Sequence, residues 1–162
     1  MSTTVPSPSG KYLAYSIQDG GSDWRIWKVL DVDTGKELSD KLEWLKFNSI
    51  SWMEDESGFF YSRFPETKEG QEFQSLNTDM AVYQHKLGDK QEKDQLVYHN
   101  ADHPEWGYQT SVSDNGRWLI ITVWVGTDSR YQLLIKDLEK KDAKPEFLVE
   151  GFKSEYAFIG SR

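Results

Sequence analysis

Three times along the chain, a polar turn that ends in glycine precedes a short run of aromatic and aliphatic residues. Three such turns end at Gly10, Gly58 and Gly116, which lie 48 residues (10 to 58) and 58 residues (58 to 116) apart. Four-stranded propeller blades recur at roughly 40–50 residues, so an insertion would account for the longer second interval. The pattern therefore predicts an internal repeat of blades.

Apolar-rich runs bounded by polar turns mark the expected strands, and at 25–30 and 46–52 alternation with a period of two places successive side chains on opposite faces of a sheet. The expected strands are 12–16, 25–30 and 38–42 in the first unit, 46–52, 58–63, 81–87 and 95–98 in the second, and 108–113, 118–124, 131–138 and 146–149 in the third. The segment 38–42 reads as a short outer strand or a link, and 155–160 resembles the first strand of another unit.

The repeat divides the chain into an incomplete blade (1–45), two complete blades (46–104 and 105–150) and the start of a further blade (151–162). A polar stretch without periodicity, Pro65 to Asp79, is expected to be a long surface loop. Since a propeller needs at least about four blades to close, we expect an all-β, partial β-propeller of about three four-stranded antiparallel blades, cut from a larger ring.

Composition excludes several classes of protein. Aromatic residues make up 14% of the chain, unlike the aromatic-poor composition of disordered proteins. The net charge is −8 with no block of basic residues, which disfavours nucleic-acid binding. There is no cysteine, no apolar run near the ~20 residues of a membrane span and no signal-peptide pattern at the first residues. We expect a cytoplasmic protein, or a periplasmic one if a signal peptide precedes this segment.

Several segments, in order along the chain, resemble the β-propeller domain of prolyl oligopeptidases. They are 20–24, 42–52, 60–65, 82–88, 105–107 and 113–128, and they include the Lys-Phe motif at 46–47 and the Ser-Asp-Asn-Gly turn at 113–116. The resemblance implies a seven-bladed parent that caps an α/β-hydrolase domain carrying a Ser-Asp-His triad. Such enzymes cleave short peptides after proline, and the propeller screens the active site.

The residues of this chain do not supply that catalysis. A nucleophile elbow needs G-x-S-x-G between a strand and a helix; the nearest approach, at Ser22, lacks the second glycine and lies between two strands. His85, His99 and His103 show no metal-ligand spacing, and His85, in mid-strand, is expected to be structural. The segment 31–35 starts like a calcium loop, but its glycine comes one place early, so we expect a tight turn. No cofactor and no metal is predicted.

Three residues are candidates for lining the substrate pocket of the parent. The resemblance places Phe47, Gly107 and Thr127 at pocket positions, the last two with smaller side chains than some family members carry. The residue types alone favour another role for Phe47, a buried anchor on an inner strand.

Two functions from different classes remain open. The first is a non-catalytic propeller fragment of a prolyl oligopeptidase-like serine endopeptidase, which gates and covers the active site. Its partners would be the missing hydrolase domain, the remaining blades and, in the parent, proline-containing peptides. The alternative is a stand-alone interaction module that self-associates, because a first unit without its inner strand and a lone last strand would leave both edges open.

Overall fold

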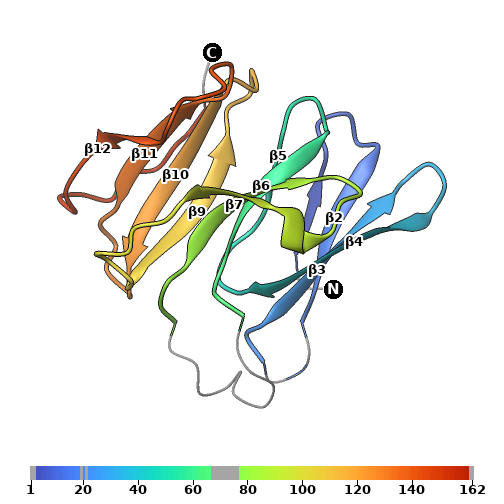
Figure 1. The fold of residues 1–162 in the computed structure, drawn as a ribbon, viewed down its shortest axis with the longest axis horizontal. Helices are drawn as coiled ribbons and strands as arrows, with labels where there is room; N and C mark the ends of the chain where they lie inside the picture. Colours follow the sequence, from blue (N-terminus) through green and yellow to red (C-terminus); the bar gives the residue numbers. More distant parts are fainter. Residues whose placement is uncertain (1–2, 19, 21, 67–76, 161–162) are drawn as a thin grey trace.

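The computed structural model describes residues 3–18, 20, 22–66 and 77–160, and within them the chain forms three four-stranded antiparallel sheets that lie side by side (Figure 1). Sheet A contains β1 (Thr4–Pro6), β2 (Tyr12–Gln18), β3 (Arg25–Asp31) and β4 (Lys36–Leu45). Sheet B contains β5 (Ser51–Trp52), β6 (Gly58–Arg63), β7 (Ala81–Lys86) and β8 (Gln95–Tyr98), with the 3-10 turn η1 (Gln91–Lys93) before β8. Sheet C contains β9 (Trp106–Val112), β10 (Trp118–Val125), β11 (Gln132–Asp137) and β12 (Glu146–Val149). The predicted fold class, an all-β partial propeller, is confirmed.

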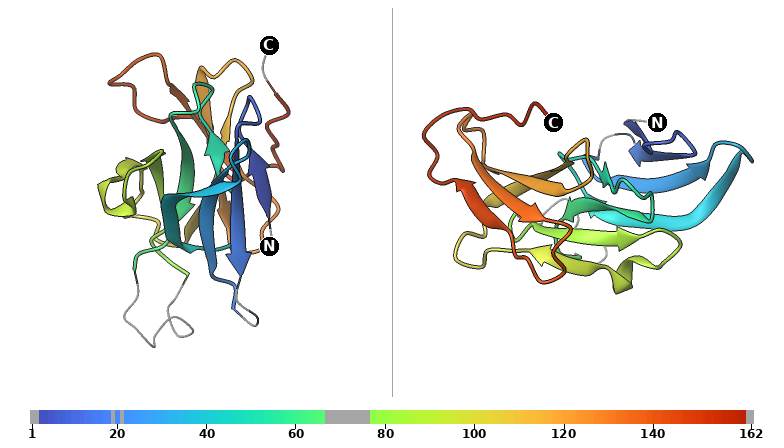
Figure 2. Two further views of the ribbon diagram at one scale, coloured as in Figure 1. Left: turned by 90° about the vertical axis from the view of Figure 1, so that its right-hand side faces the viewer. Right: turned by 90° about the horizontal axis from the view of Figure 1, so that it is seen from above.

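Each sheet is a meander in which every strand pairs with the next one along the chain. Seen from above, the three sheets fan out like neighbouring sectors (Figure 2, right). Tight turns make this winding possible. In the turn between β3 and β4, the Asp31 carboxylate accepts hydrogen bonds from the Thr34 amide and hydroxyl, at 2.8 and 2.9 Å, and Gly35 has a positive φ of 67°. The expected tight turn at 31–35 is therefore confirmed.

The core lies in the two spaces between adjacent sheets, and β6 contributes to both. Phe59 and Tyr61 belong to the cluster between sheets A and B, whereas Phe60, on the opposite face of the same strand, belongs to the cluster between sheets B and C. A strand covered on both faces is apolar on both, which explains the unbroken aromatic run at 59–61. Its burial holds the middle blade between its neighbours.

The three glycines of the sequence repeat are not structurally equivalent. Gly10 and Gly116 occupy the turn with positive φ, at 79° and 72°, but in the second unit Glu56 holds that place with φ 57°. The amides of Gly10, Glu56 and Gly116 each donate to the carbonyl three residues earlier. Gly58 is instead the first residue of β6. The repeat exists, but its alignment in the second blade is shifted by two residues from the predicted one.

Several segments outside the main predicted strands also differ from expectation. The first sheet was expected to lack its inner strand, yet Thr4–Pro6 forms β1 and pairs with β2 (Val5 opposite Ala14). The segment 38–42 belongs to a longer outer strand, β4. The segment 155–160 forms no strand, and no strand among the described residues pairs with it. The predicted loop 65–79 falls largely on 67–76, outside the described residues.

The predicted strand 46–52 is the least accurate of the set. Only Ser51–Trp52, β5, is strand, and the residues before it form an irregular link from sheet A to sheet B. Each of the three sheets falls within one of the predicted ranges 1–45, 46–104 and 105–150. Among the described residues, no helix is long and apolar enough to cross a membrane.

Candidate functional site

A cavity of about 1120 Å³ lies beside β9, β10 and the turn that follows β10. Asn77, the link before β5 and the segment 156–158 also line it. Its aromatic lining residues are Phe47, Trp124, Tyr131, Tyr156 and Phe158, and its charged ones are Glu105 and Asp128. A large concave space with mostly apolar walls and a few polar groups is typical of a ligand-binding cavity.

Phe47 lies at this cavity and not in the core. Its side chain is 51% exposed, and its φ of 66° places it in the left-handed region. The role of a buried inner-strand anchor is therefore wrong for Phe47. Strand backbone would have required a negative φ, and the positive φ turns the chain out of the sheet just before β5 begins.

Thr127 borders the same cavity from the turn between β10 and β11. Next to it, Asp128 is held by Arg130, whose Nε and Nη2 lie 2.9 and 2.5 Å from the carboxylate oxygens. These hydrogen bonds lower the pKa of Asp128 to about 2. The structure thus brings Phe47 and Thr127 together at one cavity, beside a carboxylate that is ionised at neutral pH.

Gly107 does not line the cavity itself but supports one of its walls. It lies opposite Trp124 in the β9–β10 register, and a Cβ on Gly107 would come within 3.0 Å of the Trp124 ring. The indole therefore packs directly onto the β9 backbone. Sequence reasoning missed Trp124, although a glycine inside an aromatic-rich strand signals such a close approach.

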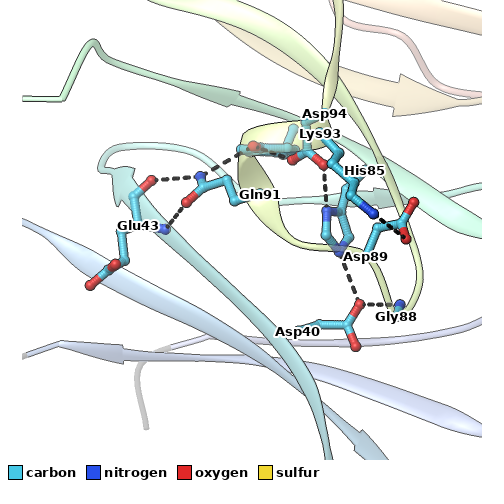
Figure 3. A network of polar contacts seen from close by, with 9 residues as sticks. Asp40, Glu43, His85, Gly88, Asp89, Gln91, Lys93 and Asp94 are labelled. Carbon is cyan, nitrogen blue, oxygen red and sulfur yellow. Dashed lines mark hydrogen bonds and ion pairs between the residues drawn. The ribbon is translucent and has the colours of Figure 1, made fainter.

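Apart from the cavity, a buried polar cluster of Asp40, His85 and Asp94 joins sheets A and B (Figure 3). We call this cluster the clasp. His85, on β7, is fully buried; its Nε2 lies 2.9 Å from Asp40 Oδ1 on β4, and its Nδ1 lies 2.7 Å from Asp94 Oδ1 after η1. Since a neutral imidazole has one N–H, two facing carboxylates favour the doubly protonated ring. Burial lowers the pKa of His85, but the hydrogen bonds and charges of the two carboxylates outweigh it and raise this pKa to about 9.

Further hydrogen bonds fix the groups of the clasp. Tyr61 donates its hydroxyl to Asp94 Oδ2 at 2.6 Å, and the Gly88 amide donates to Asp40 Oδ1 at 2.6 Å. Gln91 exchanges two hydrogen bonds of 3.0 Å with the backbone of Glu43 on β4 (Figure 3). The expected structural role of His85 is therefore confirmed, and the cluster ties one blade to the next.

Ser22, His99 and His103 each make contacts of their own. Ser22 is in the loop between β2 and β3, where its hydroxyl accepts the Trp24 amide at 3.2 Å. The ring of His103 stacks on that of Trp106, with centroids 4.2 Å apart. His99 Nε2 lies 3.9 Å from Asp79 Oδ1. Within the ranges that the structure describes, no group of three or more potential ligands is arranged to hold a metal ion. The arrangement suits binding at the aromatic cavity.

Three neighbouring four-stranded meanders, packed face to face through aromatic cores, define the chain as part of a β-propeller. The family model described as prolyl oligopeptidase, N-terminal β-propeller domain, matches residues 1–162. The chain belongs to this family.

Relatives of known name and structure agree with this assignment. The chain is 40% identical to prolyl endopeptidase of Elizabethkingia meningoseptica over 146 residues, 90% of this chain and 20% of the relative. It is 30% identical to the dual function macrocyclase-peptidase POPB of Galerina marginata over 93% of this chain and 22% of the relative. A solved prolyl endopeptidase superposes with a TM-score of 0.89 at 35% identity, over 99% of this chain and 22% of that one. The chain thus spans about a fifth of the length of these relatives.

A second solved structure includes a substrate. Prolyl oligopeptidase B of Galerina marginata, in complex with a 35-residue hydrolysis and macrocyclisation substrate, superposes with a TM-score of 0.88 at 26% identity. The match covers 99% of this chain and 24% of that chain.

Proposed function

We propose that this chain forms part of the propeller that covers and gates the active site of a serine endopeptidase of the prolyl oligopeptidase type, and that it contributes no catalytic group. Its partners would be the hydrolase domain and the remaining blades, and its substrate class short proline-containing peptides. Membership of the family supports this proposal, and so does the similarity to relatives that are prolyl endopeptidases. The mechanism is steric, because packed sheets leave a restricted passage for a peptide.

The observation that carries the proposal is the meeting of Phe47 and Thr127 at one aromatic cavity, with Gly107 beneath its Trp124 wall. These three residues lie 60 (47 to 107) and 20 (107 to 127) positions apart in the chain. A peptide side chain placed there would contact the Phe47 ring and bury apolar surface. Phe47 therefore contributes to peptide binding, and the chemistry takes place on another domain.

Kinetics of a chimera test this role. This chain would replace the homologous segment of prolyl endopeptidase from Elizabethkingia meningoseptica, and Phe47→Ala would be measured with a proline-containing reporter peptide. We expect KM to rise about tenfold with kcat nearly unchanged, since the lost contact stabilises ground state and transition state alike. Leu96→Ala, which removes an exposed apolar side chain from the outer strand β8, is the control and should leave KM within about twofold.

The same experiment separates binding from catalysis. The purified 162-residue chain alone should not hydrolyse the reporter. Turnover by this chain that survives removal of contaminating peptidases would overturn the proposal, and so would an unchanged KM in the Phe47→Ala chimera.

Exposed apolar side chains support the second candidate function, self-association as an interaction module. Phe147 and Leu148 lie on the outer strand β12 with 40% and 57% exposure. Light scattering on the isolated chain distinguishes the two functions. A single stable oligomer would support the module, whereas a monomer or a heterogeneous aggregate would contradict it.

A further inference from the structure

The link between sheets A and B holds two bulky residues in an unusual backbone conformation. Trp44 and Phe47 have φ of 68° and 66°, in the left-handed region that side chains with a Cβ rarely adopt. Such residues persist only where the surrounding structure determines them, and they gather at functional sites. The strain at Phe47 therefore needs a local cause.

Burial along this link is the reverse of what the residue types favour. Lys46 and Asn48 are 6% and 4% exposed, whereas Phe47 between them is 51% exposed. Lysine and asparagine are mostly exposed in proteins and phenylalanine is mostly buried. The link thus buries two polar side chains and presents an aromatic ring to the cavity.

An aromatic cage holds Lys46 on one side of Phe47. The Lys46 ammonium lies 3.9 Å from the ring centroid of Trp24, 5.4 Å from that of Phe64 and 5.7 Å from that of Phe47. A cation within about 6 Å of a ring face is attracted by the negative charge at that face. Trp24 is in turn packed edge-on against Phe64, with centroids 5.9 Å apart. Burial lowers the pKa of Lys46, and the charge of Asp23 opposes that shift.

Hydrogen bonds hold the other side of Phe47. The Asn48 side-chain amide donates to the Ser62 carbonyl on β6 at 2.6 Å. The Ser49 amide donates to Gln109 Oε1 on β9 at 3.3 Å. The link is therefore attached to sheets B and C immediately after Phe47.

We propose that Lys46 and Asn48 are positioning residues that hold Phe47 in its left-handed conformation, so that its ring forms a preformed wall of the cavity for an apolar side chain of a peptide. This inference rests on the proposed function for the peptide, but the positioning itself is a property of the chain. A preformed wall strengthens binding because little conformational freedom is lost when the peptide arrives.

Two substitutions of Lys46 test the cage in the chimera described above. Lys46→Met keeps an unbranched apolar side chain and removes the charge, whereas Lys46→Arg keeps a cation that can stack on the rings. For a reporter with an apolar residue that reaches Phe47, we expect Lys46→Met to raise KM about fivefold at nearly constant kcat. Lys46→Arg should restore KM to within about twofold, and a shortened reporter that does not reach Phe47 should show no change in KM.

A double variant separates positioning from a general structural role. If Lys46 acts through Phe47, Lys46→Met should add no further increase in KM in the Phe47→Ala background. Independent, multiplicative effects of the two substitutions would overturn the proposal. Trp24→Phe, which keeps a weaker ring beside the ammonium, should give an intermediate KM, and it provides a test if Lys46→Met fails to fold.

Nuclear magnetic resonance of the 162-residue chain tests positioning without any enzyme. Carbon chemical shifts and the amide–Cα proton coupling of Phe47 should report the positive φ in the parent chain and its loss in Lys46→Met. An unchanged Phe47 signature in Lys46→Met would overturn the inference. Loss of that signature together with an unchanged KM would uphold the positioning and refute the proposed contact with the peptide.

Discussion

Replacement of His85 by alanine is expected to lower the free energy of unfolding of the chain by about 3–5 kcal/mol at neutral pH. The substitution removes the cation from between Asp40 and Asp94 and leaves two carboxylates facing a buried space. Urea unfolding followed by tryptophan fluorescence measures the change. His99→Ala is the control, because His99 is partly exposed and its contact with Asp79 is long, at 3.9 Å; it should cost no more than about 1 kcal/mol. An equal loss in both variants would contradict the clasp.

The titration of His85 should also make the free energy of unfolding depend on pH. The folded-state pKa of His85 is raised to about 9 from the ordinary value of 6.5, so the folded chain binds the proton more tightly than the unfolded chain. This stabilisation is fully present below pH 6.5 and is lost as the pH rises through about 9. The difference corresponds to about 3 kcal/mol. Urea midpoints measured between pH 6 and 10 should fall for the parent chain and change little for His85→Ala.

The clasp shows why sequence reasoning could predict the role of His85 but not its partners. A histidine inside an apolar-rich strand indicates a buried imidazole, since strand alternation places it against a neighbouring sheet. Asp40 lies 45 residues away along the chain, on a strand that the pattern described as either an outer strand or a link. Its position opposite His85 depends on how sheets A and B pack, which no local pattern contains.

The same distinction between local and long-range information explains why the sequence predicted only part of the cavity. The alternation of apolar and polar residues over 46–52 matched a strand, because residue types do not report the sign of φ at Phe47. The resemblance to the family supplied Phe47, Gly107 and Thr127 as candidates, but the wall formed by Trp124 follows from the β9–β10 register. By contrast, the predicted strands 58–63, 95–98 and 146–149 have the same bounds as β6, β8 and β12, because turns and apolar runs are local features of the sequence.

Gly58→Ala is expected to destabilise the chain by about 3 kcal/mol, although Gly58 has no positive φ that would require glycine. Gly58 begins β6 opposite Lys86 on β7, and a Cβ there would come within 3.0 Å of the His85 carbonyl oxygen. That oxygen belongs to the sheet backbone, so it cannot move aside as a flexible side chain could. The pairing of β6 with β7 must therefore open at this end.

Urea unfolding measures this cost, and Gly20→Ala is the matched control. A Cβ on Gly20 meets nothing within 4 Å, so that variant should stay within about 1 kcal/mol of the parent. A change in Gly58→Ala as small as that in the control would contradict the predicted clash.

A double variant connects Gly58 to the clasp. Because a displaced His85 backbone also pulls the imidazole away from Asp40 and Asp94, part of the penalty of Gly58→Ala comes from the weakened clasp. Gly58→Ala should therefore cost less in the His85→Ala background than in the parent chain, with a coupling free energy of about 1 kcal/mol. Strict additivity would mean that the clash is absorbed at the strand end without reaching the clasp.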